Sequence, residues 1–159
     1  MIVDWDRIEH AWHDAVVDAI VDTIGSNPDE RFYAGAFWLL QGDYSSILCP
    51  AFGLNCERSD PEIRWHPPDW RWSVVDLAVE AVRPLYLPLE ELRVDQPTFD
   101  ALWEQHIATL CAVSKGVTGR ARSGRIAAPP DAFTESFFVG IVDFAHGDEA
   151  EEYLRRSVD

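Results

Sequence analysis

Nine residues near the middle of the chain, Arg64–Trp72, carry the side chains best suited to binding chemistry. Three of the seven tryptophans, Trp65, Trp70 and Trp72, fall within this stretch, and two prolines fix the backbone before the last two. Indole rings bury a large area with few rotatable bonds, so such a cluster is typical of a core anchor or of a recognition surface. The sequence leaves both interpretations open.

Three acid–base side chains accompany these tryptophans. A carboxylate such as Glu57 or Asp69 beside an indole pocket can act as an acid, and His66 lies between the two in sequence. A small hydrolase or a ligand-binding domain would need a pocket that gathers Glu57, His66 and Asp69. Capping and loop hydrogen bonds explain the same residues equally well.

The motifs of well-known enzyme classes are missing from the sequence. It contains no P-loop and no GxGxxG, GxSxG or HExxH pattern. We therefore expect no cofactor, no metal site and no assignable catalytic residue, and the sequence favours a non-enzymatic protein. His106 lies within a helical apolar stripe, where a core histidine is the simplest interpretation.

A second candidate surface lies on the first predicted helix. Asp4 or Asp6 can cap this helix, which we expect to run to about Ile24. Asp14, Asp18 and Asp22 then form a row at i, i+4 and i+8 on its polar face. The row is either a solvated face or a docking site for a basic partner.

Composition limits the classes of partner. The chain has 159 residues, enough for one domain spanning 1–159, and a net charge of -15. This charge argues against nucleic acid and against anionic membranes, which need a basic surface. Three cysteines without a CxxC pattern, and no visible signal peptide or membrane span, lead us to expect a cytoplasmic protein.

The remaining pattern predicts an α+β domain. The expected sheet is small and mostly antiparallel, formed by an N-terminal hairpin and a late strand, and three main helices pack on it. The expected elements after the first helix are a central strand at 32–40, an edge strand at 46–52, a helix capped by Asp69 and ended or kinked by Pro84, a helix from Asp95 or Gln96 to Gly116, an arginine-rich loop at 118–130, a strand at 137–142 and a short exposed helix at 148–156.

Several short stretches resemble a bacterial family catalogued as domain of unknown function 4303. They are Trp5 in the first helix, Phe32-Tyr33-Ala34, Pro50 to Asn55 with Glu57, Arg64-Trp65-His66-Pro67 with Asp69-Trp70, the late strand closing on Asp143, and Ser157-Val158. The pattern formed by Trp65, Pro67 and Trp70 is the most specific part. The chain departs from the family in its proline-interrupted 84–97 segment and its arginine-rich loop.

The resemblance implies no established enzyme activity. Members of this family look similar in size and character to small immunity proteins of bacterial toxin systems. We therefore expect a protein-binding, immunity-type domain that neutralises a basic, toxin-like partner, with the small hydrolase or ligand-binding domain as the alternative. A homodimer formed through the aromatic patch is a third possibility beside a monomer.

Overall fold

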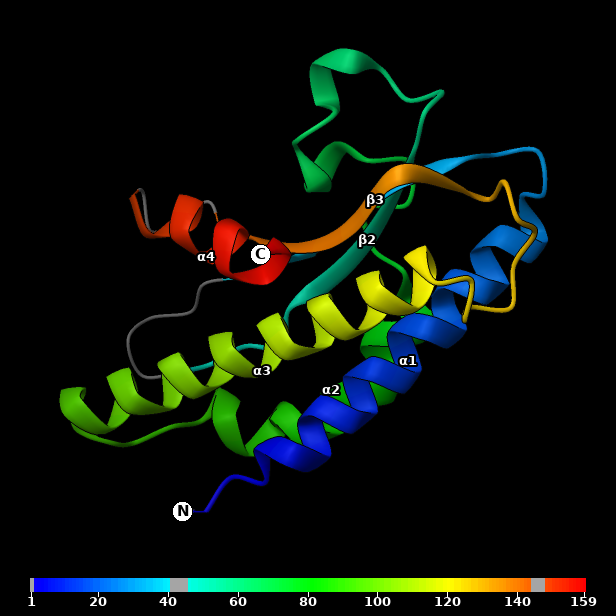
Figure 1. Cartoon of the computed structure of the whole chain (residues 1–159). Coiled ribbons are helices and arrows are strands. Elements are labelled where there is room, and N and C mark those ends of the chain that lie inside the picture. The colour runs from blue at the N-terminus through cyan, green and yellow to red at the C-terminus, as the bar shows by residue number, and fades with distance from the viewer. Residues whose placement is uncertain (1, 41–45, 144–147) are drawn as a thin grey trace.

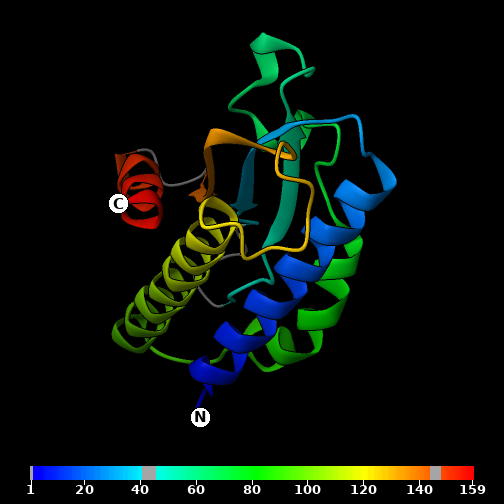
Figure 2. The same cartoon turned by 45° about the vertical axis from the view of Figure 1, so that its right-hand side comes forward.

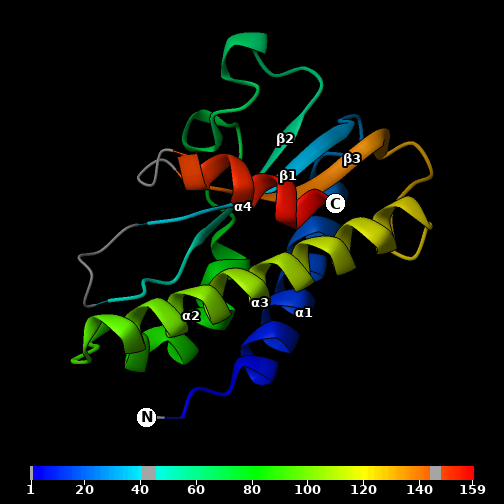
Figure 3. The same cartoon turned by 60° about the vertical axis from the view of Figure 1, so that its left-hand side comes forward.

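The computed structural model describes residues 2–40, 46–143 and 148–159 and has an α+β fold (Figure 1). Three strands form one sheet, and helices α1 (Trp5–Ser26), α2 (Asp76–Glu90) and α3 (Gln96–Arg122) pack on one of its faces. The segment between the second strand and α2 lies on the opposite face, and helix α4 (Asp148–Val158) runs beside the third strand (Figures 1 and 3).

The helix starts follow local signals for α1 and α3. The carboxylate of Asp4 accepts a hydrogen bond from the backbone of Arg7 at 3.0 Å, and Asp95 does the same for Thr98 at 3.0 Å. Both are N-cap bonds, which satisfy backbone donors that the first turn of a helix leaves unpaired. The predicted starts of these two helices are therefore confirmed. No described helix combines the length and apolarity that crossing a bilayer requires.

The sheet is mixed, so the prediction of a mostly antiparallel sheet was wrong. Strand β1 (Phe32–Trp38) lies in the centre, antiparallel to β2 (Ala51–Cys56) and parallel to β3 (Phe133–Val142). The chain begins with α1, and the β1–β2 hairpin follows it. Helix α3 returns the chain to the end of the sheet where β1 starts, so β3 runs parallel to β1. The predicted central position of β1 is correct.

Several predicted boundaries differ from the structure. Strand β2 begins after Pro50 and not at Ser46, so the connection from β1 is longer than expected, and part of it (41–45) lies outside the described residues. Helix α2 continues through Pro84 and Pro88. Both prolines are exposed, so water can bond the carbonyls that they leave without a donor.

Two further expectations fail at the ends of elements. Asp69 does not cap α2, because it lies in a separate short turn, and Val75 precedes the first turn of α2 without a side-chain cap. Helix α3 extends to Arg122, so part of the predicted arginine-rich loop is helical. Helix α4 is also less exposed than predicted, since Tyr153 and Ser157 are buried.

Both edges of the sheet are closed by hydrogen bonds. On β3, the backbone N–H of Val139 donates to Oγ1 of Thr118 at 2.9 Å, and that of Ile141 donates to Oγ of Ser157 at 3.0 Å. On β2, the segment 72–75 runs alongside the strand and pairs with it. A homodimer that extends the sheet through either edge would have to displace these contacts.

Candidate functional site

The structure separates the three clustered tryptophans. Trp70 is only 5% exposed, and its indole N–H donates to the carbonyls of Ile63 and Arg64 at 3.1 and 3.2 Å. Trp72 is half-buried, whereas Trp65 is 58% exposed. The anchor interpretation therefore describes Trp70, and Trp65 presents a ring to solvent.

A buried polar chain holds the loop that carries Trp65. Nδ2 of Asn55 donates to the hydroxyl of Tyr33 at 2.7 Å, and this hydroxyl donates to the carbonyl of Arg64 at 2.7 Å. Oδ1 of Asn55 also accepts from the hydroxyl of Ser59. Burial raises the pKa of Tyr33, so its hydroxyl keeps the proton that this bond needs. The backbone beside Trp65 is thus fixed by the sheet.

A carboxylate and two arginines fasten the same loop at its ends. Oε1 of Glu30 lies 2.6 Å from Nη1 of Arg71 and 3.9 Å from Nη1 of Arg58. Burial of Glu30 would raise its pKa, but the hydrogen bonds from Cys56 and Arg71 and the positive charge of Arg58 outweigh it, so the pKa is lowered. These contacts give the arginines of this region a structural role that the sequence did not indicate.

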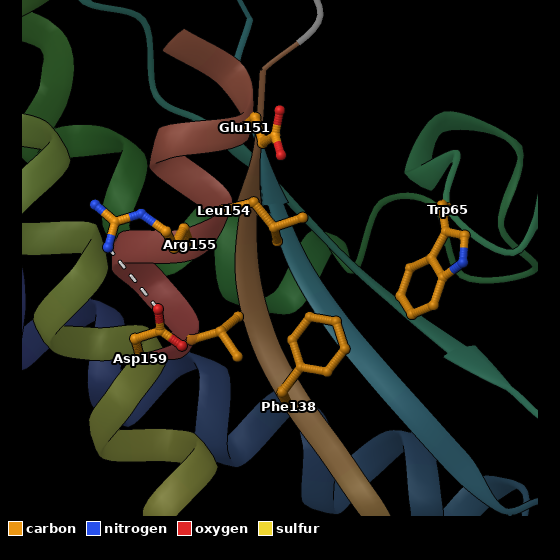
Figure 4. Close-up of a pocket in the computed structure, with 7 residues that line it drawn as sticks. Trp65, Phe138, Glu151, Leu154, Arg155 and Asp159 are labelled. Atoms are coloured by element: carbon orange, nitrogen blue, oxygen red, sulfur yellow. Dashed lines mark ion pairs between the residues drawn. The ribbon is translucent and has the colours of Figure 1, made fainter. Parts of the chain in front are cut away.

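Trp65 forms one wall of a groove, which we call the Trp65 groove (Figure 4). The opposite wall is α4, and Phe138 of β3 lies between them. The rings of Trp65 and Phe138 stack with centroids 5.9 Å apart and an angle of 24°. The groove has a volume of about 410 Å³, within the range of ligand pockets. Its lining residues are Trp65, Phe138, Glu151, Leu154, Arg155, Val158 and Asp159.

The walls of the groove are mainly apolar, and its charges lie on α4 and on Asp159, the residue that follows it. Arg155 pairs with Asp159 at 3.9 Å in an exposed ion pair, and Glu151 adds a further carboxylate (Figure 4). Helix α4 approaches the strand closely because Gly140 has no side chain: a Cβ there would lie 2.8 Å from Leu154. The arrangement could hold a flat apolar group against Trp65 with a polar group towards α4.

The predicted acid–base residues do not line this groove. Nδ1 of His66 and Oδ2 of Asp69 are 2.8 Å apart, an orientation that a carboxylate gives to a general base. Glu57 instead pairs with Arg31 at 3.6 Å. None of the three side chains belongs to the lining of the Trp65 groove.

Asp14, Asp18 and Asp22 are all exposed on α1, and we call them the acidic row. Nδ1 of His13 lies 3.6 Å from Asp14. Within the described part of the chain, no lysine or arginine forms an ion pair with any member of the row. The row thus presents three carboxylates to solvent along two turns of helix.

A buried polar network lies between the helices. The indole N–H of Trp12 donates to the hydroxyl of Tyr86 at 3.1 Å, and this hydroxyl lies 3.2 Å from Nδ1 of His106. Burial lowers the pKa of His106 to about 3, so the imidazole is neutral. Its Nε2 finds no hydrogen-bond partner among the described residues. This is the core histidine that the sequence predicts, and it lines neither candidate surface.

Sequence reasoning missed the partners of Trp65 in the groove. Phe138 lies in the predicted late strand and is one of the residues that face away from the three-helix layer, as the alternation of burial in β3 shows. Leu154 and Val158 lie one helical turn apart in the predicted C-terminal helix. The amphipathic spacing of that helix was a usable signal, but it did not say which face of the sheet the helix covers.

Comparison with known proteins adds no functional assignment. No protein-family model, no curated protein and no solved structure matches the chain. Among the described residues, no three His, Cys, Asp or Glu side chains form a group that could hold a metal ion. The resemblance to domain of unknown function 4303 stays a prediction.

Proposed function

We propose that this protein is a non-enzymatic binding domain that neutralises a basic, toxin-like protein partner. The observation that carries the proposal is the acidic row, Asp14, Asp18 and Asp22, exposed on one helix without an ion-paired lysine or arginine among the described residues. Like charges at this spacing cost about 0.2–0.5 kcal/mol for each neighbouring pair in a helix. Cations supplied by a partner would offset that repulsion.

The charge of the whole chain supports the same partner. A net charge of -15 creates a negative field that attracts basic proteins and raises their association rate. Exposed charges are screened over about 10 Å at 0.1 M salt and about 3 Å at 1 M. Binding of this kind is therefore faster and tighter at low salt than at high salt.

The test is capture of partners by the tagged protein from its native cells, first at low salt and then at about 0.5 M salt. We expect a basic protein in stoichiometric amount whose recovery falls at the higher salt concentration. Charge reversal at Asp14, Asp18 and Asp22 should reduce its recovery as well. Recovery of no protein, or of an acidic protein that is indifferent to salt, would exclude the proposal.

The Trp65 groove favours a second candidate, a small-molecule-binding domain. Its volume of about 410 Å³ and its stacked aromatic wall suit a flat apolar ligand. The test is a screen of small aromatic compounds by ligand-observed NMR, with Trp65→Ala as the control. Compounds that bind the protein and lose binding in the variant would support this candidate, and compounds that bind both forms equally would count against it.

A further inference from the structure

Helix α2 leaves an apolar stripe uncovered. Leu77, Ala81, Pro84 and Pro88 follow one another at i, i+4, i+7 and i+11, and all four are exposed, Leu77 by 52%. We call these residues the α2 stripe. The buried face of the same helix is formed by other positions: Ala78, Val82, Tyr86 and Leu89. The core therefore does not account for the apolar character of the stripe.

Helix α2 lies beside α1, and the two helices run antiparallel (Figures 1 and 2). A cavity of about 380 Å³ separates the first turns of α1 from the last turns of α2. Pro84 and Pro88 of the stripe line this cavity together with Arg7 of α1. Further along, Trp12 bonds to Tyr86, which fixes the register of the pair.

This register places the acidic row next to the stripe. Asp18 follows Arg7 by eleven residues, about three turns, so it projects from nearly the same side of α1 as a residue that lines the cavity with α2. Because the helices are antiparallel and Trp12 meets Tyr86, Asp22, ten residues after Trp12, comes to about the same level as Leu77, nine residues before Tyr86. Helix α3 lies on the other side of α1, where a Cβ on Gly116 would contact His13 at 3.4 Å.

The two features also agree in length. At 1.5 Å per residue, the stripe from Leu77 to Pro88 is about 16 Å long, and the row from Asp14 to Asp22 about 12 Å. Together they form a surface that is apolar along one side and negative along the other. Such a surface matches a helix of about three turns that carries apolar side chains on one face and lysine or arginine on the adjacent face.

We propose that the α1–α2 surface binds a basic amphipathic helix of the partner, with its apolar face on the α2 stripe and its cations against the acidic row. This inference rests on the proposed function, because it assigns a region of the partner to a region of this chain. The inference goes beyond the proposed function because it names the surface that binds the partner. The Trp65 groove lies outside this surface.

The test uses a synthetic peptide of about 18 residues with leucines along one face and lysines beside them. A second peptide of identical composition has the same residues in scrambled order. We expect the first peptide, added to the isotope-labelled full chain, to shift NMR signals of 14–22 and 74–88. It should bind at least about tenfold more tightly than the scrambled peptide, which keeps the charge and loses the apolar face.

Two pairs of charge reversals distinguish the contribution of the α1–α2 surface to peptide binding from that of the overall net charge. Asp18→Lys with Asp22→Lys should weaken peptide binding at least about tenfold. The control, Asp131→Lys with Glu135→Lys, changes the net charge equally at exposed positions outside the α1–α2 surface and should weaken it less than about threefold. Leu77→Ser removes apolar contact without changing charge and should weaken binding about fivefold.

Equal weakening by both pairs of reversals, or peptide-induced shifts around the Trp65 groove instead of α1 and α2, would overturn the inference. Absence of peptide binding would overturn it as well. None of these results contradicts the capture of a basic protein from cells, so the proposed function would stand. Conversely, capture that recovers no basic protein would end the proposed function even where the peptide binds.

Discussion

Mild acid should destabilise this protein through His106. Its imidazole is fully buried, and burial lowers its pKa from the ordinary value of 6.5 to about 3. The hydroxyl of Tyr86 accepts the proton of Trp12 and has one proton of its own, which a neutral Nδ1 of His106, 3.2 Å away, can accept. Protonation of Nδ1 would remove this acceptor and place a positive charge in a fully buried site.

The direction and the size of the stability change follow from the pKa values of His106 in the folded and the unfolded chain. Because the folded pKa lies below the unfolded one, protons bind the unfolded chain more tightly, and stability falls as the pH drops below 6.5. At about 1.4 kcal/mol for each pH unit, the loss between about pH 7.5 and pH 5 is about 2 kcal/mol. The contribution continues to fall until the folded pKa near 3 is reached.

The assay is urea unfolding at about pH 7.5 and pH 5 for the natural chain and for His106→Gln, which keeps an acceptor and does not titrate. The lower pH stays above the isoelectric point of 4.5, where association would interfere. The natural chain should lose about 2 kcal/mol more than the variant. Any constant cost of the substitution cancels in this comparison. An equal loss in both proteins would refute the argument from burial.

Four further predictions concern packing, backbone freedom and a hydrogen bond, and each is measured by urea unfolding at neutral pH. Trp70→Ala should cost about 3–5 kcal/mol, and Trp65→Ala less than about 1 kcal/mol, because only the first ring is buried; similar costs would contradict the separation of the two rings. Gly53→Ala should cost about 1–3 kcal/mol, because its Cβ would lie 2.7 Å from a backbone oxygen. Gly119→Ala, with open space in α3, should stabilise by about 0.5–1 kcal/mol. Ser157→Ala should cost about 1–3 kcal/mol by leaving a β3 N–H unpaired, and no loss would mean that water replaces the hydroxyl.

The features that the sequence predicted correctly are those with local causes. The starts of α1 and α3 depend on aspartate caps within four residues, and the central strand β1 is an uninterrupted apolar run. Strand β2 was predicted too early in the chain, at 46–52, and the structure continues it through Asn55, a residue type that is uncommon in strands. Its amide is satisfied by Tyr33, which is 22 positions away in the sequence.

The remaining errors have long-range causes. The direction of β3 depends on the end of the sheet at which α3 stops, and no residue pattern within β3 indicates that position. Trp65 and Trp70 have the same chemistry, and their burial differs because Trp70 packs with Ala34 and Ala36, whose small side chains leave room for one indole. Helical periodicity alone could place the acidic row. The α2 stripe could not be placed in this way, because the sequence predicted that the helix ends or kinks at Pro84, whereas α2 continues through both prolines.

The parallel pairing of β1 with β3 also has a consequence for folding. Gly35 lies opposite Val139, roughly 100 positions further along, so β1 gains its second neighbour only when almost the whole chain has been made. During synthesis, an apolar strand with one open edge therefore exists for as long as the ribosome needs to add α2 and α3. We expect slow folding for a domain of this size, and early termination before β3 should yield aggregation-prone fragments and not a smaller stable domain.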